Sequence, residues 1–179
     1  ASRGCPYSCI FCSSNSMWGY QRRKPVANVM KEIQYLKQQR GVDNFGFSDD
    51  CLPLNKDWFA DLLGELDKAK VSWSCFSRLD VLHAKMIKRI RQAGCSTIYH
   101  GIESGSARMR VVLNKKLDPH IDNSYILSFV KKEIDAGLNP ICSFMSGIPT
   151  ETRKDMLETC KLAYALKELG ATVQLWIMT

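Results

Sequence analysis

The chain has 179 residues, 45% of them hydrophobic, which is long enough for one domain with a substantial core. No run of about 18 apolar residues occurs and no signal peptide precedes the cysteines, so neither a membrane span nor a secreted disulfide framework is expected. The net charge of +7 is spread over predicted helices apart from the run Arg22–Lys24, which favours a solvated basic surface over nucleic-acid binding. We expect a protein of the reducing cytoplasm.

Three of the eight cysteines stand in one short loop near the first residue. Cys5, Cys9 and Cys12 have the spacing C-x3-C-x2-C, close enough to converge on one iron–sulfur cluster. Three protein ligands leave one iron with an open position, which usually signals chemistry rather than structure. Structural zinc is the alternative, but zinc usually takes four protein ligands and no fourth His or Cys is obviously paired with the loop. The scattered cysteines are expected to be buried spectators: Cys51, Cys75, Cys95, Cys142 and Cys160.

Apolar periodicity predicts a regular alternation of helices and strands after this loop. Helices are expected at 26–40, 56–69, 82–93 and 151–169, and in a longer segment, 105–137, that Pro119 splits. Strands are expected at 44–47, 71–77, 97–102, 140–145 and 172–178. Asn55 is expected to cap the second helix. A glycine lies at the end of a predicted helix, just before a strand, at four positions: Gly41, Gly94, Gly137 and Gly170.

This alternation predicts repeated β-α units, a parallel sheet and one domain, with helices covering one side of the sheet. A partial barrel is the preferred geometry, and a flat doubly wound sheet stays open because the pattern separates the two poorly. Ligands collect at the carboxyl ends of such strands. Polar residues follow the predicted strands at Asp49, Asp50, Ser77, Arg78, Glu103, Ser104, 146–151 and Thr179.

The cysteine loop, with the aromatic Phe11 before its last cysteine, resembles the signature of the radical S-adenosylmethionine (radical SAM) superfamily. The resemblance extends over essentially the whole chain. It is most similar to the cobalamin-binding subgroup, with the methylthiotransferases second, in the segments Ser2–Cys12, Phe47–Asp50, Trp73–Asp80, Gly101–Ser106 and Met145–Glu151. The resemblance implies an α/β fold: a partial (β/α)6 radical SAM-type barrel with a parallel sheet, whose first strand is largely truncated. Residues 1–179 would then be a radical SAM core domain cut from a longer protein.

The resemblance also implies two cofactors. Cys5, Cys9 and Cys12 would ligate a [4Fe-4S] cluster, and S-adenosylmethionine (SAM) would chelate its fourth iron. The family often has Gly-Gly-Glu where this chain reads Ser48-Asp49-Asp50, so the carboxylate for the methionine ammonium is Asp49 or Asp50, with Asp49 favoured. The other implied SAM contacts are Phe11 at the adenine, Arg78 at the carboxylate, Glu103 at the ribose, and Ser143, Gly147 and Ile177 as further lining.

Simpler structural roles compete with some of these assignments. Arg78 and Asp80 are close enough in sequence to form a surface ion pair, and the two aspartates are close enough to a loop to cap it. His100 is out of phase with Glu103, so on a strand its side chain should point away from the site.

The implied reaction is reductive cleavage of SAM to a 5′-deoxyadenosyl radical, followed by methyl transfer to an unactivated carbon with cobalamin. Cobalamin would be bound by a domain that is not in this chain. Methylthiolation, radical cyclisation or rearrangement, and a core fragment without turnover of its own in a larger assembly are the alternatives. The implied partners are a one-electron reductant of the flavodoxin or ferredoxin type and a small-molecule or peptide substrate, with no membrane.

Overall fold

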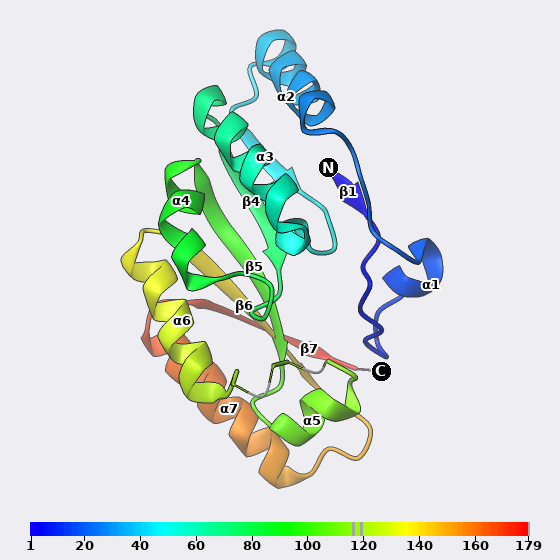
Figure 1. The fold of residues 1–179 in the computed structure, drawn as a ribbon. Coiled ribbons are helices and arrows are strands. Elements are labelled where there is room, and N and C mark those ends of the chain that lie inside the picture. Colours follow the sequence, from blue (N-terminus) through cyan, green and yellow to red (C-terminus); the bar gives the residue numbers. More distant parts are fainter. Residues whose placement is uncertain (116, 119, 179) are drawn as a thin grey trace.

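A computed structural model describes residues 1–115, 117–118 and 120–178. Its centre is a five-stranded parallel sheet in which spatial order follows sequence order (Figure 1). The strands are β3 (Asn44–Phe47), β4 (Ser72–Ser77), β5 (Cys95–Glu103), β6 (Asn139–Ser146) and β7 (Thr172–Ile177). A doubly wound sheet reverses its strand order at a switch point, and this sheet does not. The predicted α/β fold with a barrel-type parallel sheet is therefore confirmed.

The long helices and the short helix α4 (Ile87–Gln92) cover one face of this sheet and leave the other face open (Figure 1). The long helices are α2 (Val26–Arg40), α3 (Lys56–Ala69), α6 (Asn123–Asp135) and α7 (Arg153–Glu168). Other short elements are the 3-10 turns η1 (Leu52–Leu54) and η2 (Ala84–Met86), and the helix α5 (Ala107–Val112). Asn55 caps α3 as predicted, because its side chain accepts a hydrogen bond of 2.9 Å from the Trp58 backbone nitrogen.

The core lies between the sheet and the helices. Trp73 of β4 is fully buried, contacts the rings of Phe47 and Phe59 edge-on, and donates its indole N–H to the Ala93 carbonyl at 2.7 Å. This hydrogen bond satisfies the one polar atom of a large apolar side chain, so burial carries no desolvation penalty there.

Three local features differ from the sequence-based expectations. The helix predicted at 82–93 is divided into η2 and α4. The residues where a truncated first strand was expected form β1 (Ser2–Arg3), which pairs antiparallel with β2 (Arg22–Arg23) outside the parallel sheet. Helix α1 (Ser14–Trp18) follows the cysteine loop. Elements of two to five residues have no measurable periodicity, so the sequence could not reveal them.

Pro119 and Thr179, which the sequence reading used as a helix breaker and a strand end, lie outside the described residues. Across the part of the chain that is described, no helix has the length and apolar character needed to cross a membrane.

Candidate cofactor-binding site

The cysteine loop is fastened to the end of helix α5. The backbone nitrogen of Ile10 donates to the Leu113 carbonyl at 3.0 Å, and the Asn114 amide donates to the Ser8 carbonyl at 2.8 Å. Asn114 adopts a left-handed conformation with φ of 52°, which asparagine tolerates better than most residues. The segment that carries the loop lies over the open side of the sheet, away from the long helices (Figure 1).

Donor groups approach two of the three cysteine sulfurs. A guanidinium nitrogen of Arg78 lies 3.8 Å from the Cys9 sulfur, and the Ser14 backbone N–H donates to the Cys12 sulfur at 3.5 Å. Burial raises the pKa of the Cys5 thiol, and Arg78 opposes that rise. Three sulfur ligands suit an iron–sulfur cluster better than a hard cation.

Within residues 1–115, 117–118 and 120–178, no three Cys, His, Asp or Glu side chains converge on the position of a single metal ion. The ligands of an iron–sulfur cluster bind different irons, so they stand farther apart than the ligands of one ion. The three cysteine sulfurs of the loop are the ligand type that an iron–sulfur cluster requires.

The structure separates the two candidate aspartates. Asp49 is buried and accepts hydrogen bonds from the backbone nitrogen and the hydroxyl of Ser2, so it ties β1 to the end of β3. Asp50 is exposed to the open side, accepts a 3.1 Å hydrogen bond from the Gly4 backbone nitrogen and lines a pocket there. Of the two carboxylates, the structure places Asp50 in the pocket wall, although the sequence reading favoured Asp49.

Arg78 links the end of β4 to the cysteine loop. Its guanidinium forms a fork with the Asp80 carboxylate, at 2.9 and 2.8 Å, and lies 3.7 Å from the centre of the Tyr7 ring. The Arg78–Asp80 pair expected as a surface alternative thus exists, but the arginine is buried. Arg78 holds Tyr7 and faces Cys9 at the same time.

A second ion pair, between Glu103 and Lys115, is buried at the carboxyl end of β5. The Lys115 ammonium lies 2.5 Å from a Glu103 oxygen, and 6.0 Å from the centre of the Phe11 ring. Glu103 has a φ of 67°, a conformation that costs about 1–3 kcal/mol for a residue other than glycine and often marks a functional site. A Cβ on Gly101 would lie 2.3 Å from the Glu103 carboxylate and 2.4 Å from the ammonium, so only glycine leaves room for the pair.

These groups surround one pocket of about 280 Å³ on the open side of the sheet. Four of the predicted site residues line it: Asp50, Arg78, Glu103 and Ser143. Trp176, whose strand was also expected to shape the site, lines the pocket too, whereas Phe76, Tyr99 and Lys115 were not predicted. Alternation along the strands would have suggested the aromatic residues, but nothing local connects Lys115 to Glu103.

The remaining predicted residues lie outside that lining in the described part of the chain. Phe11 is half-buried and packs against a small cluster formed by Met109, Leu113 and Ile148. Gly147 has a φ of 81° and donates its N–H to Glu151 at 2.8 Å. Ile177, at the end of β7, is 75% exposed.

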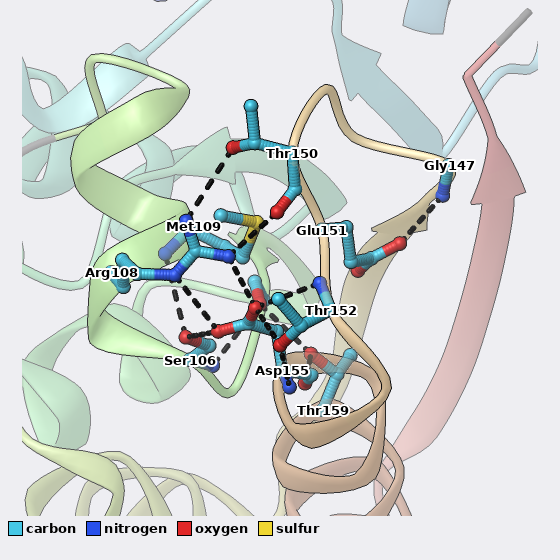
Figure 2. A network of polar contacts seen from close by, with 10 residues as sticks. Ser106, Arg108, Met109, Gly147, Thr150, Glu151, Thr152, Asp155 and Thr159 are labelled. Carbon is cyan, nitrogen blue, oxygen red and sulfur yellow. Dashed lines mark hydrogen bonds and ion pairs between the residues drawn. The ribbon is translucent and has the colours of Figure 1, made fainter.

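A polar network joins the first turns of α5 and α7 (Figure 2). Asp155 accepts hydrogen bonds from Arg108 at 2.5 Å, from Ser106 at 2.6 Å and from the Thr152 hydroxyl at 2.5 Å. These donors hold the pKa of the Asp155 carboxyl well below its usual range, and Arg108 has the largest effect. The network positions α5, which in turn fastens the cysteine loop, and the turn that contains Gly147.

Comparison with known proteins identifies the family. The model of the radical SAM superfamily matches residues 1–163. The chain belongs to the radical SAM superfamily. An uncharacterized methyltransferase of Pyrococcus horikoshii is 34% identical over 168 residues, which are 92% of this chain and 36% of that protein. The anaerobic magnesium-protoporphyrin IX monomethyl ester cyclase of Cereibacter sphaeroides is 28% identical over 91% of this chain and 27% of its own length.

Solved structures of radical SAM enzymes share the fold. The radical SAM methyltransferase TsrM from Kitasatospora setae, with cobalamin and a [4Fe-4S] cluster bound, has a TM-score of 0.85 and 16% identity, over 98% of this chain and 33% of that one. The cobalamin-dependent radical SAM enzyme OxsB has a TM-score of 0.75 and 18% identity, over 90% of this chain and 25% of that one. The chain thus spans about a third of the length of these relatives. The predicted resemblance to the radical SAM superfamily is confirmed.

Proposed function

We propose that residues 1–179 are the core domain of a longer radical SAM enzyme that binds a [4Fe-4S] cluster and SAM. The observation that carries the proposal is the position of the cysteine loop. Arg78 contacts both Tyr7 and Cys9 of the loop, and it also lines the pocket that contains the Glu103–Lys115 pair. A cluster site and an organic ligand site with charges of both signs are thereby adjacent.

Cys5, Cys9 and Cys12 hold the cluster in this proposal. When bound and reduced, the cluster supplies the electron that cleaves SAM to methionine and a 5′-deoxyadenosyl radical. The protein's own contribution is positional: Arg78 and the Ser14 N–H contact the Cys9 and Cys12 sulfurs, and the contacts of Ser8 and Ile10 with the end of α5 fix the loop.

SAM needs an anion for its ammonium, a cation for its carboxylate and an acceptor for its ribose. Asp50 is the carboxylate that lines the pocket beside Gly4 and Cys5, so we assign it to the ammonium. Lys115 and Arg78 are the cations of the pocket wall, and Glu103 is the acceptor for the ribose hydroxyls. Phe11 gives the adenine an apolar neighbour next to the cluster of Met109, Leu113 and Ile148.

Methyl transfer with cobalamin is the reaction that the relatives favour. The relative that is 34% identical is named a methyltransferase, and the structures of TsrM, a methyltransferase, and OxsB, a cobalamin-dependent enzyme, share the fold. Cobalamin would be bound by another domain of the longer protein. Methylthiolation and radical cyclisation are second candidates, because a methylthiotransferase of Methanocaldococcus jannaschii and the cyclase are similar over 88% and 91% of the chain.

The reaction also consumes an electron, so a one-electron carrier of the flavodoxin or ferredoxin type is the proposed partner, in the cytoplasm. The basic surface formed by the paired strands β1 and β2 suggests that the carrier has an acidic surface. These strands contain Arg3, Arg22 and Arg23, which lie in sequence just before the cysteine loop and just after α1. Charge of one sign at the cluster would steer such a carrier toward it.

Anaerobic reconstitution tests the proposal. The chain is loaded with iron and sulfide, mixed with SAM and dithionite, and assayed for 5′-deoxyadenosine and methionine. We expect one 4Fe cluster per chain and release of both products. A chain that binds zinc instead of a cluster would overturn the proposal, whereas a cluster without any SAM cleavage would favour the core fragment that needs the rest of its assembly.

A further inference from the structure

The pocket has a second part, formed by two aromatic side chains. Phe76 of β4 and Tyr99 of β5 are paired in register and line the pocket below the charged end that contains Glu103 and Lys115. Their rings are stacked, with centres 4.7 Å apart and an angle of 27° between their planes. We call these two residues the aromatic floor.

The aromatic floor is open to the pocket although β4 and β5 bury the side chains that alternate with it. Phe76 is 46% exposed, whereas Cys75 and Ile98, the neighbours that alternate with Phe76 and Tyr99, are 3% and 0% exposed. Rings of this size dominate the energetics of binding when they become covered. A group of exposed apolar side chains inside a pocket is typical of a binding site rather than of a solvated surface.

We infer that the aromatic floor binds the substrate through a flat, conjugated ring. The inference rests on the proposed function, because SAM would take the charged end of the same pocket. Two nearly parallel rings offer a face on which a third ring can stack in the preferred offset arrangement. The Glu103–Lys115 pair takes the space above Gly101, so the ring would lie over Phe76 and Tyr99, beside Ser143.

A ring with polar edges fits the pocket better than an apolar protein segment. The pocket wall includes the polar side chains of Ser143 and Gln174. The Ser143 hydroxyl already donates to the His100 carbonyl at 3.4 Å, so Gln174 is the group that an apolar segment would cut off from water, at a cost in free energy. A ring with polar substituents at its edge leaves the Gln174 amide able to form hydrogen bonds.

Two probes of similar size separate the contribution of a planar ring to binding from that of the carboxylate charge. Indole-3-acetate has a planar ring and cyclohexylacetate a saturated one, and each carries one carboxylate. Equilibrium dialysis with the full chain, reconstituted with its cluster and saturated with SAM, measures both dissociation constants. We expect indole-3-acetate to bind more tightly by up to about tenfold, which is the upper end of what one stacked aromatic pair contributes.

Two variants test whether indole-3-acetate binds at the aromatic floor. Phe76→Leu keeps an apolar side chain but removes the ring, and we expect it to abolish the preference for indole-3-acetate. Tyr35→Ala is the matched control, because Tyr35 is an exposed aromatic residue (60%) of helix α2. It should keep the preference. Equal binding of the two probes to the unmodified chain, or equal loss in both variants, would overturn the inference.

The dissociation constant of SAM, measured on the same samples, separates this inference from the proposed function. Phe76→Leu should change SAM affinity less than twofold. If the variant weakens SAM and indole-3-acetate equally, the floor belongs to the SAM site and the inference is wrong, while the proposed function stands. If SAM fails to bind and the preference for indole-3-acetate persists in its absence, the proposed function is wrong and the aromatic floor remains a binding site.

Discussion

The two faces of strand β5 place similar residue types in opposite settings. On the face toward the helices, Ile98 and His100 are at most 1% exposed, and the His100 ring contacts both carboxylate oxygens of Glu133 on α6 at 2.9 and 3.0 Å. On the open face, Glu103 pairs with Lys115 inside the pocket, from a backbone conformation with positive φ. One carboxylate is thus part of the packed core, and the other is held ready at a ligand site.

Because successive side chains of β5 point to opposite faces, residues that stabilise the fold and residues that face the ligand site alternate along one strand. Side chains toward the helices are covered on all sides, so removing a partner there leaves a buried polar group unpaired. Side chains toward the open face meet a pocket, where water or a ligand can replace a lost partner. The prediction that His100 points away from Glu103 is confirmed by its contact with α6.

The largest effect is expected from the cysteines. Cys9→Ala removes one of three proposed cluster ligands on the open side, so iron content after anaerobic reconstitution should fall from about four per chain to background. Cys160→Ala, an exposed thiol on helix α7, is the matched control and should keep full iron content. Equal loss of iron in both variants would contradict the assignment of the loop.

The next largest effect should distinguish the two carboxylates of the comparison. Glu133→Ala leaves His100 buried without its partner, and we expect it to lower the free energy of unfolding by about 3 kcal/mol in urea titrations. Glu103→Gln should cost only about 1 kcal/mol of stability, because the amide oxygen can still accept a hydrogen bond from Lys115, but it should weaken SAM binding about tenfold. Equal stability losses in the two variants would remove the distinction between the faces.

A smaller effect is expected at Gly101. An added Cβ would meet the ends of the Glu103 and Lys115 side chains, which can move aside, so Gly101→Ala should displace the pair rather than unfold the strand. We expect SAM affinity to fall about threefold to tenfold, with a loss of stability under about 1 kcal/mol.

Gly46→Ala on β3 is the control for that experiment, since its Cβ would lie 3.8 Å from the Ser74 hydroxyl, an ordinary contact. Dialysis with labelled SAM and urea titration give the two readings. Unchanged SAM affinity in Gly101→Ala would show that the Glu103–Lys115 pair does not hold the cofactor.

The smallest effect concerns pH and the network between α5 and α7. The pKa of Asp155 is lowered in the folded chain, so its carboxylate stabilises the fold above the unfolded pKa of about 3.9, and that stabilisation is lost as pH falls through the lower folded value. Asp155→Asn should therefore lower the melting temperature at pH 7, and the difference from the unmodified chain should narrow below about pH 4. Asp135→Asn, which removes an exposed pair with Lys131, should change it little at any pH. A constant difference between pH 7 and pH 3 for Asp155→Asn would contradict this account.

Much of the fold could be predicted because it depends on short-range patterns. Strand β3 and helices α2 and α3 begin and end where the apolar spacing, Asn55 and Gly41 indicated. The cysteine loop could likewise be predicted from the sequence, since its three thiols lie within eight consecutive residues. Patterns of this kind need only neighbours along the chain, because turns of helix and alternation in strands repeat every few residues.

The tertiary structure decided which polar residues meet. Asp49 and Asp50 are adjacent in sequence, yet one ties down Ser2 and the other lines the pocket, because the strand ends there and successive side chains point in different directions. Lys115 reaches Glu103 across a helix, and the rings of Phe76 and Tyr99 stack from two neighbouring strands. Such meetings depend on the register of strands far apart in the chain, and register is set by the packing of the whole sheet against its helices rather than by any local spacing.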